Sequence, residues 1–253
     1  MEVCLSPGCV ADGAEHTLLG LRTLLSFSSS ATLSDKGEEK KDLPSVVVKA
    51  GDCVSLCGNG PIVICNGVKK VKQVNSASKM SELLFGSDGG DSSKGFSDAQ
   101  KTMIQALDTL QDGNNSKKAN NFEEASVSYE KAVVMGMKVI DSFEGKVHSS
   151  CYQWLAQARR DQASCYLEIN NIDKAVVSAK DGSHFATKEG DDALLYTCLE
   201  VYQEALEKTG DAVEELRVLD MFMGLPEPSN QIQKNKRRQL GFRRQRLERE
   251  AKQ

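Results

Sequence analysis

Four cysteines in the N-terminal quarter of the sequence have the type and spacing of a metal or redox site. Cys4 and Cys9 form a C-x4-C pair, and Cys53 and Cys57 form a C-x3-C pair further along the chain. Four thiolates that a fold brings together can hold a zinc ion or an iron–sulfur cluster. Two disulfides, a redox dithiol and four cysteines that bind nothing are the alternatives. The spacing by itself leaves all of these open.

The distribution of the eight cysteines favours a metal site over a secreted disulfide framework. Five lie in the first 65 residues, and Cys151, Cys165 and Cys198 lie in sequence with helical character, where they suit small buried positions. Disulfide frameworks are denser and occur in shorter chains. The N-terminus lacks the basic and apolar regions of a secretory signal, and no apolar run approaches the ~18 residues of a membrane span. No organellar transit peptide is recognisable.

The elements that must position these cysteines have a mixed strand and helix pattern. We expect a short strand before Cys4, a helix over 14–25, a polar loop over 26–42, a strand over 46–48, a hairpin formed by 61–65 and 68–74, and a helix over 76–84. Asn66-Gly67 suits the tight turn of that hairpin.

The residues around the second cysteine pair are the most specific part of the pattern. A β-branched run precedes the pair, and Cys57 is followed by Gly58, Asn59, Gly60 and Pro61 and then by the apolar 62–65. Residues 1–85 thereby resemble the thioredoxin-like 2Fe-2S ferredoxins, including the ferredoxin-like subunit of respiratory complex I. That family has C-x4-C after its first strand, and C-x3-C followed by Gly, a small turn, Pro and a strand.

The resemblance implies a set of cluster ligands. Cys4 and Cys9 would hold one iron of a 2Fe-2S cluster, and Cys53 and Cys57 the other. The loop 58–60 would lie beside the cluster, where backbone N–H groups can tune its potential. Cys65 falls outside the ligand set, so we interpret it as a core residue or a neighbour of the cluster.

The chain changes character after residue 85. Residues 86–95, GSDGGDSSKG, have the composition of a flexible linker, and no strand pattern follows Phe96. Asn-Asn, Gly-Asp and Glu-Gly-Asp break the remainder into six expected helices at 98–112, 122–145, 149–168, 172–188, 192–208 and 211–223. A turn pair, an apolar residue, two polar residues and usually Ala recur at 120–125, 170–175 and 210–215, which indicates an internal repeat.

This half resembles tetratricopeptide repeats over about residues 98–224. The matching positions are small and aromatic residues at helix contacts: Ala125, Tyr129 and Ala132 in the first copy, and Ala163, Tyr166 and Ala175 in the second. Glu215 replaces the expected Ala in a looser third copy. The resemblance implies a groove that binds a protein partner. Leu110 and Asp161 do not match the positions that clamp a terminal carboxylate in the chaperone-binding subfamily. Trp154 is expected in the core.

The C-terminal tail, 227–253, is basic. Residues 234–252 carry nine Lys and Arg residues against Glu248 and Glu250, while the whole chain has a net charge of −4. We expect a solvated helix, a disordered arm or a contact with the acidic body; RNA is the alternative partner. Phe242 is its one aromatic residue, so the stacking typical of single-strand binders is thin.

The sequence has no P-loop, dinucleotide-binding, zincin, nucleophile-elbow or C-x-x-C motif, so we expect no substrate-converting site. The predicted fold is an α/β thioredoxin-like domain (1–85), a linker (86–97), an all-α tetratricopeptide-like domain (98–226) and the tail (227–253). The predicted function is an iron–sulfur electron-transfer or redox-sensing adaptor that docks on a protein partner. A scaffold or assembly factor with a structural or absent cluster is the alternative. The pairing of domains looks plant- or alga-like, which favours a plastid over a mitochondrion or the cytoplasm.

Overall fold

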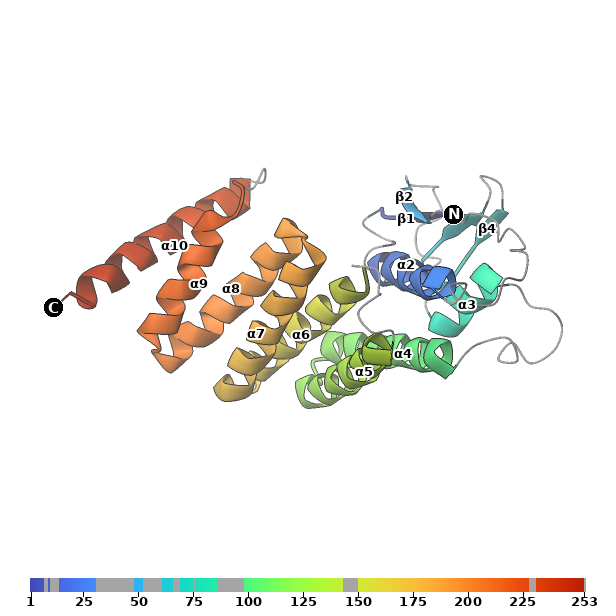
Figure 1. Cartoon of the computed structure of the whole chain (residues 1–253), viewed down its shortest axis with the longest axis horizontal. Coiled ribbons are helices and arrows are strands. Elements are labelled where there is room, and N and C mark those ends of the chain that lie inside the picture. The colour runs from blue at the N-terminus through green and yellow to red at the C-terminus, as the bar shows by residue number, and fades with distance from the viewer. Residues whose placement is uncertain are drawn as a thin grey trace. The chain divides into compact units, whose positions relative to one another are not determined.

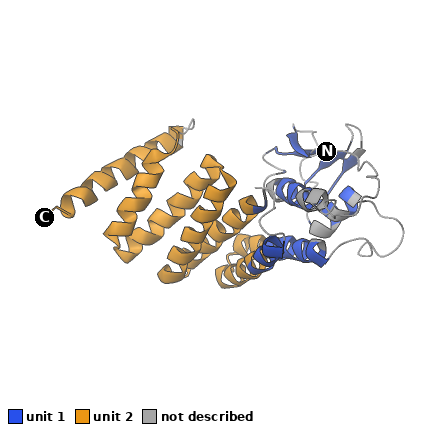
Figure 2. Cartoon of the chain, viewed as in Figure 1, with its two compact units in different colours: residues 1–112, 134–151 blue, residues 113–133, 152–253 orange. Residues whose placement is uncertain are grey.

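The computed structural model describes residues 1–6, 9, 14–30, 48–51, 61–65, 69–74, 76–85, 98–142, 150–227 and 231–252 (Figure 1). The chain divides into two compact units, one made of 1–112 with 134–151 and the other of 113–133 with 152–253 (Figure 2). The division falls inside three helices, at 112/113, 133/134 and 151/152. The expected linker, 86–97, lies outside the described residues, so the predicted domain boundaries stay predictions.

A small mixed sheet lies in the first unit, as expected. Its strands are β1 (Glu2–Cys4), β2 (Lys49–Gly51), β3 (Val63–Cys65) and β4 (Lys69–Val71), in the order β2-β1-β3-β4. β1 runs parallel to β2 and antiparallel to β3, and β3 and β4 form the predicted antiparallel hairpin. The described part of the second strand begins at Lys49, after Val48, while residues 46–47 of the expected strand lie outside the described residues. In that register Lys49 lies opposite Glu2, and their side chains form an ion pair of 2.8 Å.

Two helices accompany this sheet, α2 (Ala14–Ser30) and α3 (Ala77–Phe85). α2 continues five residues beyond the expected end at 25 and buries Leu21 and Leu24. It is tied to the segment after β4, because the Thr17 hydroxyl donates to the Val74 carbonyl at 2.5 Å. Gly20 allows α3 to approach, since a Cβ at this position would lie 2.4 Å from the sulfur of Met80.

Helices make up the rest of the described chain, as the pattern predicted. They are α4 (Asp98–Lys118), α5 (Phe122–Ser142), α6 (Ser150–Glu168), α7 (Ile172–Glu189), α8 (Asp192–Thr209), α9 (Ala212–Gly224) and α10 (Gln231–Glu250). α4 runs through Gly113 to Lys118, six residues beyond its expected end at 112. In the second unit α7 packs on α8, α8 on α9 and α9 on α10.

The helix breaks rest on residues in the left-handed region. Asn120 and Asn170 have φ of 61° and 57°, and Gly190 and Gly210 have φ of 78° and 75°. After α4 and α6 the residue that follows each left-handed Asn donates to the carbonyl five positions back, which closes a Schellman motif. Asn and Gly enter this region at low cost, so the Asn-Asn and Gly-Asp signals end the helices as predicted.

The core of the second unit follows the helix contacts. Trp154 is fully buried, as expected, and Tyr196 and Phe222 lie with ring centroids 4.2 Å apart. Two residues of the C-terminal helix, Leu240 and Leu247, belong to the same buried cluster as Tyr196 and Phe222. Among the helices of the described ranges, none combines the length and apolar character that crossing a membrane requires.

Candidate functional site

Cys4 and Cys9, the first predicted ligand pair, are both buried, with 1% of each residue exposed. Cys4 is the last residue of β1, where its backbone N–H donates to the Ile62 carbonyl at 3.1 Å. Its thiol lies 3.4 Å from the hydroxyl of Ser6. The sheet therefore fixes the backbone of the first predicted ligand, and little water reaches either thiol.

Cys53 and Cys57, the second predicted pair, lie outside the described residues, as do residues 58–60 of the expected loop. In the described part of the chain, no three His, Cys, Asp or Glu residues form a group that could hold a metal ion. The four-cysteine site thus stays a prediction. Cys65 lies at the end of β3 opposite Lys69 and is partly exposed.

The cysteines of the helical half occupy core positions, as predicted. Cys151, Cys165 and Cys198 are fully buried. Burial raises the pKa of Cys165 to about 11 and that of Cys198 to about 12. The Cys198 thiol points at the Ala156 carbonyl at 3.8 Å. Both groups stay protonated near neutral pH, so they are poor nucleophiles and poor metal ligands.

The small residues of the predicted repeats are where the helices approach closely. Ala125, Ala132, Ala163 and Ala175 are all completely buried. Gly113 has the same role in α4, although the sequence pattern did not single it out. A Cβ on Gly113 would lie 3.0 Å from two ring atoms of Tyr129, which is itself buried.

One polar network connects α4, α6 and α8. The Asp161 carboxylate accepts from Lys117 at 2.9 Å and from Arg160 at 3.0 Å, and Arg160 also donates to the Thr197 hydroxyl at 3.4 Å. Burial by itself would lower the pKa of Arg160, but the adjacent Asp161 outweighs it and raises the pKa. Lys117 and Arg160 are therefore both paired with Asp161.

A second network joins α5, α6 and α7. The amide of Gln162 donates to Glu130 at 2.9 Å and to the Ser126 carbonyl at 3.0 Å, and it accepts from Ser178 at 3.1 Å. Arg159 pairs with the same Glu130 carboxylate. Burial alone would raise the pKa of Glu130, but the hydrogen bonds from Gln162 and Arg159 lower it overall.

The segment predicted as a third copy carries a buried ion pair that sequence reasoning missed. Glu215, which replaces the expected Ala, is 1% exposed and accepts two hydrogen bonds from Arg243 of α10, at 2.9 and 3.0 Å. Gln203 of α8 also donates to it, at 3.2 Å. Glu215 raises the pKa of Arg243. A carboxylate inside an apolar repeat position, together with unexplained cations in the tail, was the signal that could have suggested this pairing.

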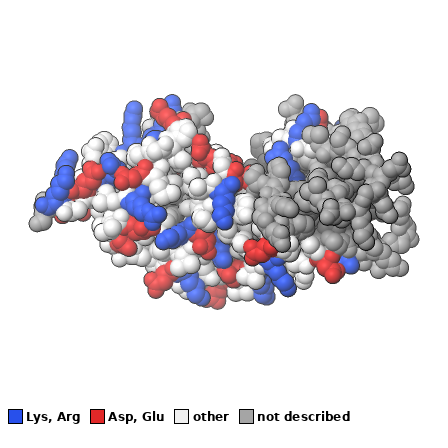
Figure 3. Space-filling view, in the orientation of Figure 1, with Lys and Arg blue, Asp and Glu red and all other residues white. Residues whose placement is uncertain are grey.

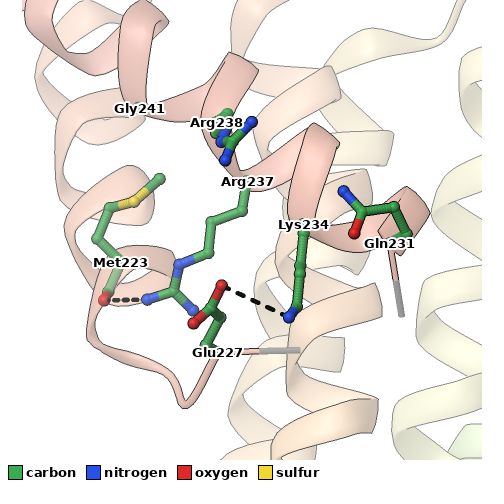
Figure 4. Close-up of a pocket in the computed structure, with 7 residues that line it drawn as sticks. All are labelled: Met223, Glu227, Gln231, Lys234, Arg237, Arg238 and Gly241. Carbon is green, nitrogen blue, oxygen red and sulfur yellow. Dashed lines mark hydrogen bonds and ion pairs between the residues drawn. The ribbon is translucent and has the colours of Figure 1, made fainter. Parts of the chain in front are cut away.

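A pocket of about 580 Å³ lies between the end of α9 and the first half of α10 (Figure 4). It is lined by Met223, Glu227, Gln231, Lys234, Arg237, Arg238 and Gly241. Arg237 donates to the Met223, Leu225 and Pro226 carbonyls at 2.6, 2.8 and 3.0 Å, and so satisfies the C-terminal end of α9. Lys234 lies 3.9 Å from Glu227.

The tail is thus a packed helix that contacts the acidic body, which was one of the expected alternatives. Figure 3 shows Lys and Arg side chains alternating with Asp and Glu over the visible face of the helices. Lys236 pairs with Glu200 at 3.1 Å and Arg244 with Asp220 at 2.5 Å.

Comparison with models of protein families, with curated proteins and with solved structures finds no match to this chain.

Proposed function

We propose that this chain is an iron–sulfur adaptor. Its N-terminal region adopts a thioredoxin-like fold and binds a 2Fe-2S cluster through Cys4, Cys9, Cys53 and Cys57. Its tetratricopeptide-like helices hold a protein partner. The observation that carries the proposal is the burial of Cys4, the last residue of β1, and of Cys9, five residues further on, because buried thiols beside a strand that fixes the backbone suit a soft metal centre.

The sheet register supports the same ligand set. Cys4 pairs with Gly51 across the parallel strands, and the Leu5 N–H donates to the Gly51 carbonyl at 3.3 Å. Cys53 stands two residues after Gly51 in the sequence. Two residues span at most about 7 Å, so the chain that leads to the second cysteine pair starts beside the first.

The topology and the helix contacts support the proposed fold. A parallel pair of strands, with a helix between them in the sequence, precedes an antiparallel hairpin, which is compatible with a thioredoxin-like domain. Buried alanines and left-handed Asn and Gly turns recur along the helices, which is compatible with tetratricopeptide-like pairs. A bound cluster would supply one-electron chemistry. The helices would set which partner lies near it. The plant-like pairing of such domains makes a plastid the compartment that we propose.

Visible and EPR spectroscopy of anaerobically purified and reconstituted protein test this proposal. We expect visible absorption that bleaches on reduction and an EPR signal from about two irons per chain. Cys4→Ser and Cys53→Ser should abolish or strongly perturb both signals. Cys65→Ser is the matched control, since it removes a nearby thiol outside the ligand set, and it should preserve them.

Protein that stays colourless after reconstitution would refute the cluster and leave the scaffold function. In that case partner capture from the native source should be the same for the wild-type chain and for Cys53→Ser. If neither protein contains metal and Cys53→Ser fails to capture the partner that the wild-type chain captures, both the iron–sulfur adaptor and the scaffold function are contradicted.

A further inference from the structure

The C-terminal helix α10 divides its side chains between two faces. Its inner face is fixed to the second unit by Leu240 and Leu247, by the Arg243–Glu215 pair, and by the Tyr196 hydroxyl, which donates to the Gln233 carbonyl at 2.9 Å. These contacts, at 233, 240, 243 and 247, are seven, three and four residues apart, so one side of the helix is held along most of its length. The opposite side is consequently presented to solvent in a defined orientation.

The outer face of α10 consists of exposed residues with the same helical spacing. They are Asn235, Arg238, Gln239, Phe242, Gln245, Arg246 and Arg249, and we call this set the outer stripe. Phe242 is 70% exposed, with Arg238 and Arg246 four residues away on either side. The stripe contains three arginines and three amides, and the one acidic residue beside it is Glu250, at its C-terminal end, which lies 3.7 Å from Arg246. Arg238 to Arg249 spans about 17 Å along the helix, from the rise of ~1.5 Å per residue.

We propose that the outer stripe binds single-stranded nucleic acid. Arginine guanidinium groups match phosphate oxygens in a two-pronged geometry and stack on bases, which lysine does not do. An exposed aromatic ring between cations is what an unpaired base stacks on. The amides add donors and acceptors for base edges. One Phe limits the stacking, so the affinity comes mainly from phosphate contacts.

The pocket beside α10 extends this surface. Arg238 belongs both to the outer stripe and to the pocket lining, where Gln231, Lys234 and Arg237 also lie. The cations of the lining outnumber its single carboxylate, Glu227. A strand that follows the stripe toward the start of α10 thus meets a positively charged hollow of about 580 Å³. This inference goes beyond the proposed redox function and does not depend on a bound cluster.

Other occupants fit the stripe less well. A membrane surface would need several large apolar residues on the face that enters the lipid, and the stripe has only Phe242. A partner helix would need an apolar groove with anchors at helical spacing. Charge complementarity therefore favours a polyanion with bases over both.

Fluorescence anisotropy with labelled 20-nucleotide RNA and DNA strands of the same sequence tests the proposal on the full chain. Phe242→Ala should weaken binding roughly 5- to 100-fold, the range for losing one stacked base. Arg238→Gln/Arg246→Gln/Arg249→Gln should reduce the slope of log affinity against log salt by about 2, from ~0.7 per phosphate contact. Tighter binding to RNA than to DNA identifies RNA as the ligand. Equal binding shows that the stripe accepts single-stranded RNA and DNA alike.

Matched controls distinguish the stripe from general charge. Lys101→Gln/Lys131→Gln/Lys138→Gln removes the same charge from exposed positions on α4 and α5, and it should change the affinity less than twofold. Equal losses in the two triple variants, with no loss in Phe242→Ala, would reduce the binding to nonspecific attraction and overturn the proposal. Absence of binding at 50 mM salt would also overturn the proposal. Polyglutamate that competes as well as unlabelled RNA would overturn it too, because that result indicates an acidic protein partner. All exchanged side chains are exposed, and circular dichroism checks that each variant is folded.

Discussion

Removal of Arg243 is the sharpest test of how the C-terminal helix is held. Arg243→Ala leaves the Glu215 carboxylate in a position that is 1% exposed, where Gln203 is its remaining donor within the described ranges. Glu215→Ala has the opposite effect, because it removes the buried charge and leaves a guanidinium that is 21% exposed and lies 4.0 Å from Glu207. The two single variants should therefore differ strongly, although each breaks the same pair.

The burial of the carboxylate sets the expected magnitude. Breaking a buried pair from one side typically costs ~3–5 kcal/mol, and the remaining Gln203 bond places Arg243→Ala at about 3 kcal/mol. Glu215→Ala loses a charged hydrogen bond without stranding a buried charge, which costs about 1.5 kcal/mol. The double variant, Glu215→Ala/Arg243→Ala, no longer contains the carboxylate, so it should be more stable than Arg243→Ala by about 1–2 kcal/mol.

Urea denaturation of the four proteins measures these differences. Trp154 is the only Trp and is fully buried, so its fluorescence reports unfolding of the second unit. Arg244→Ala is the matched control, since it removes an arginine whose partner Asp220 lies at the exposed surface. The reasoning is refuted if Arg243→Ala costs no more than Arg244→Ala, or if the double variant is less stable than Arg243→Ala.

Three further predictions concern the packing and titration of the helices. The pKa of Glu130 is lowered in the folded protein, so the Glu130 carboxylate stabilises the fold above the ordinary carboxyl pKa, and this stabilisation is lost as the pH falls through the pKa of the folded state. Acid titration followed by circular dichroism should therefore show a shallower loss of stability in Glu130→Gln than in the wild-type chain. An acid titration curve that is the same for both proteins would contradict this prediction. Gly113→Ala gains ~1 kcal/mol of helix propensity, but the added methyl group crowds the buried Tyr129 at a cost of ~2 kcal/mol, so the variant should lose about 1 kcal/mol of stability in a thermal melt. Gly224→Ala is the control, because a Cβ there meets nothing within 4 Å, and it should be neutral or stabilising. Burial raises the pKa of Cys198 to about 12, so a thiol reagent at neutral pH should modify it only after unfolding, and fast labelling of native protein would count against the structure.

Local signals predicted the helices well, because the chain breaks at residues that enter the left-handed region at low cost. Asn120 and Asn170 end their helices as the Asn-Asn pairs suggested. Long-range contacts caused the differences. α4 continues through Gly113, whose missing Cβ leaves room for the Tyr129 ring, and a single sequence window does not show such a contact.

The candidate site was predictable only in part, for a related reason. The sequence indicated a strand leading to Cys4, and the structure has Cys4 at the end of that strand with Cys4 and Cys9 both buried, while Cys53 and Cys57 lie outside the described residues. The partner of Glu215 lies in α10, 28 residues further along the chain. Hydrophobic periodicity identifies which face of a helix is buried. It does not identify which later helix supplies the charge partner of a residue on that face.

The buried carboxylate at Glu215 also has a consequence for which neighbour the helical array accepts. The earlier segments predicted as copies have Ala125 and Ala175 at this position, and an interface of small side chains would accept any similar helix pair. An interface that contains a buried carboxylate accepts only a neighbour that supplies a cation, and here Arg243 of the C-terminal helix supplies it. The buried carboxylate therefore favours the C-terminal helix, which supplies Arg243, over a neighbour that offers no cation at this place.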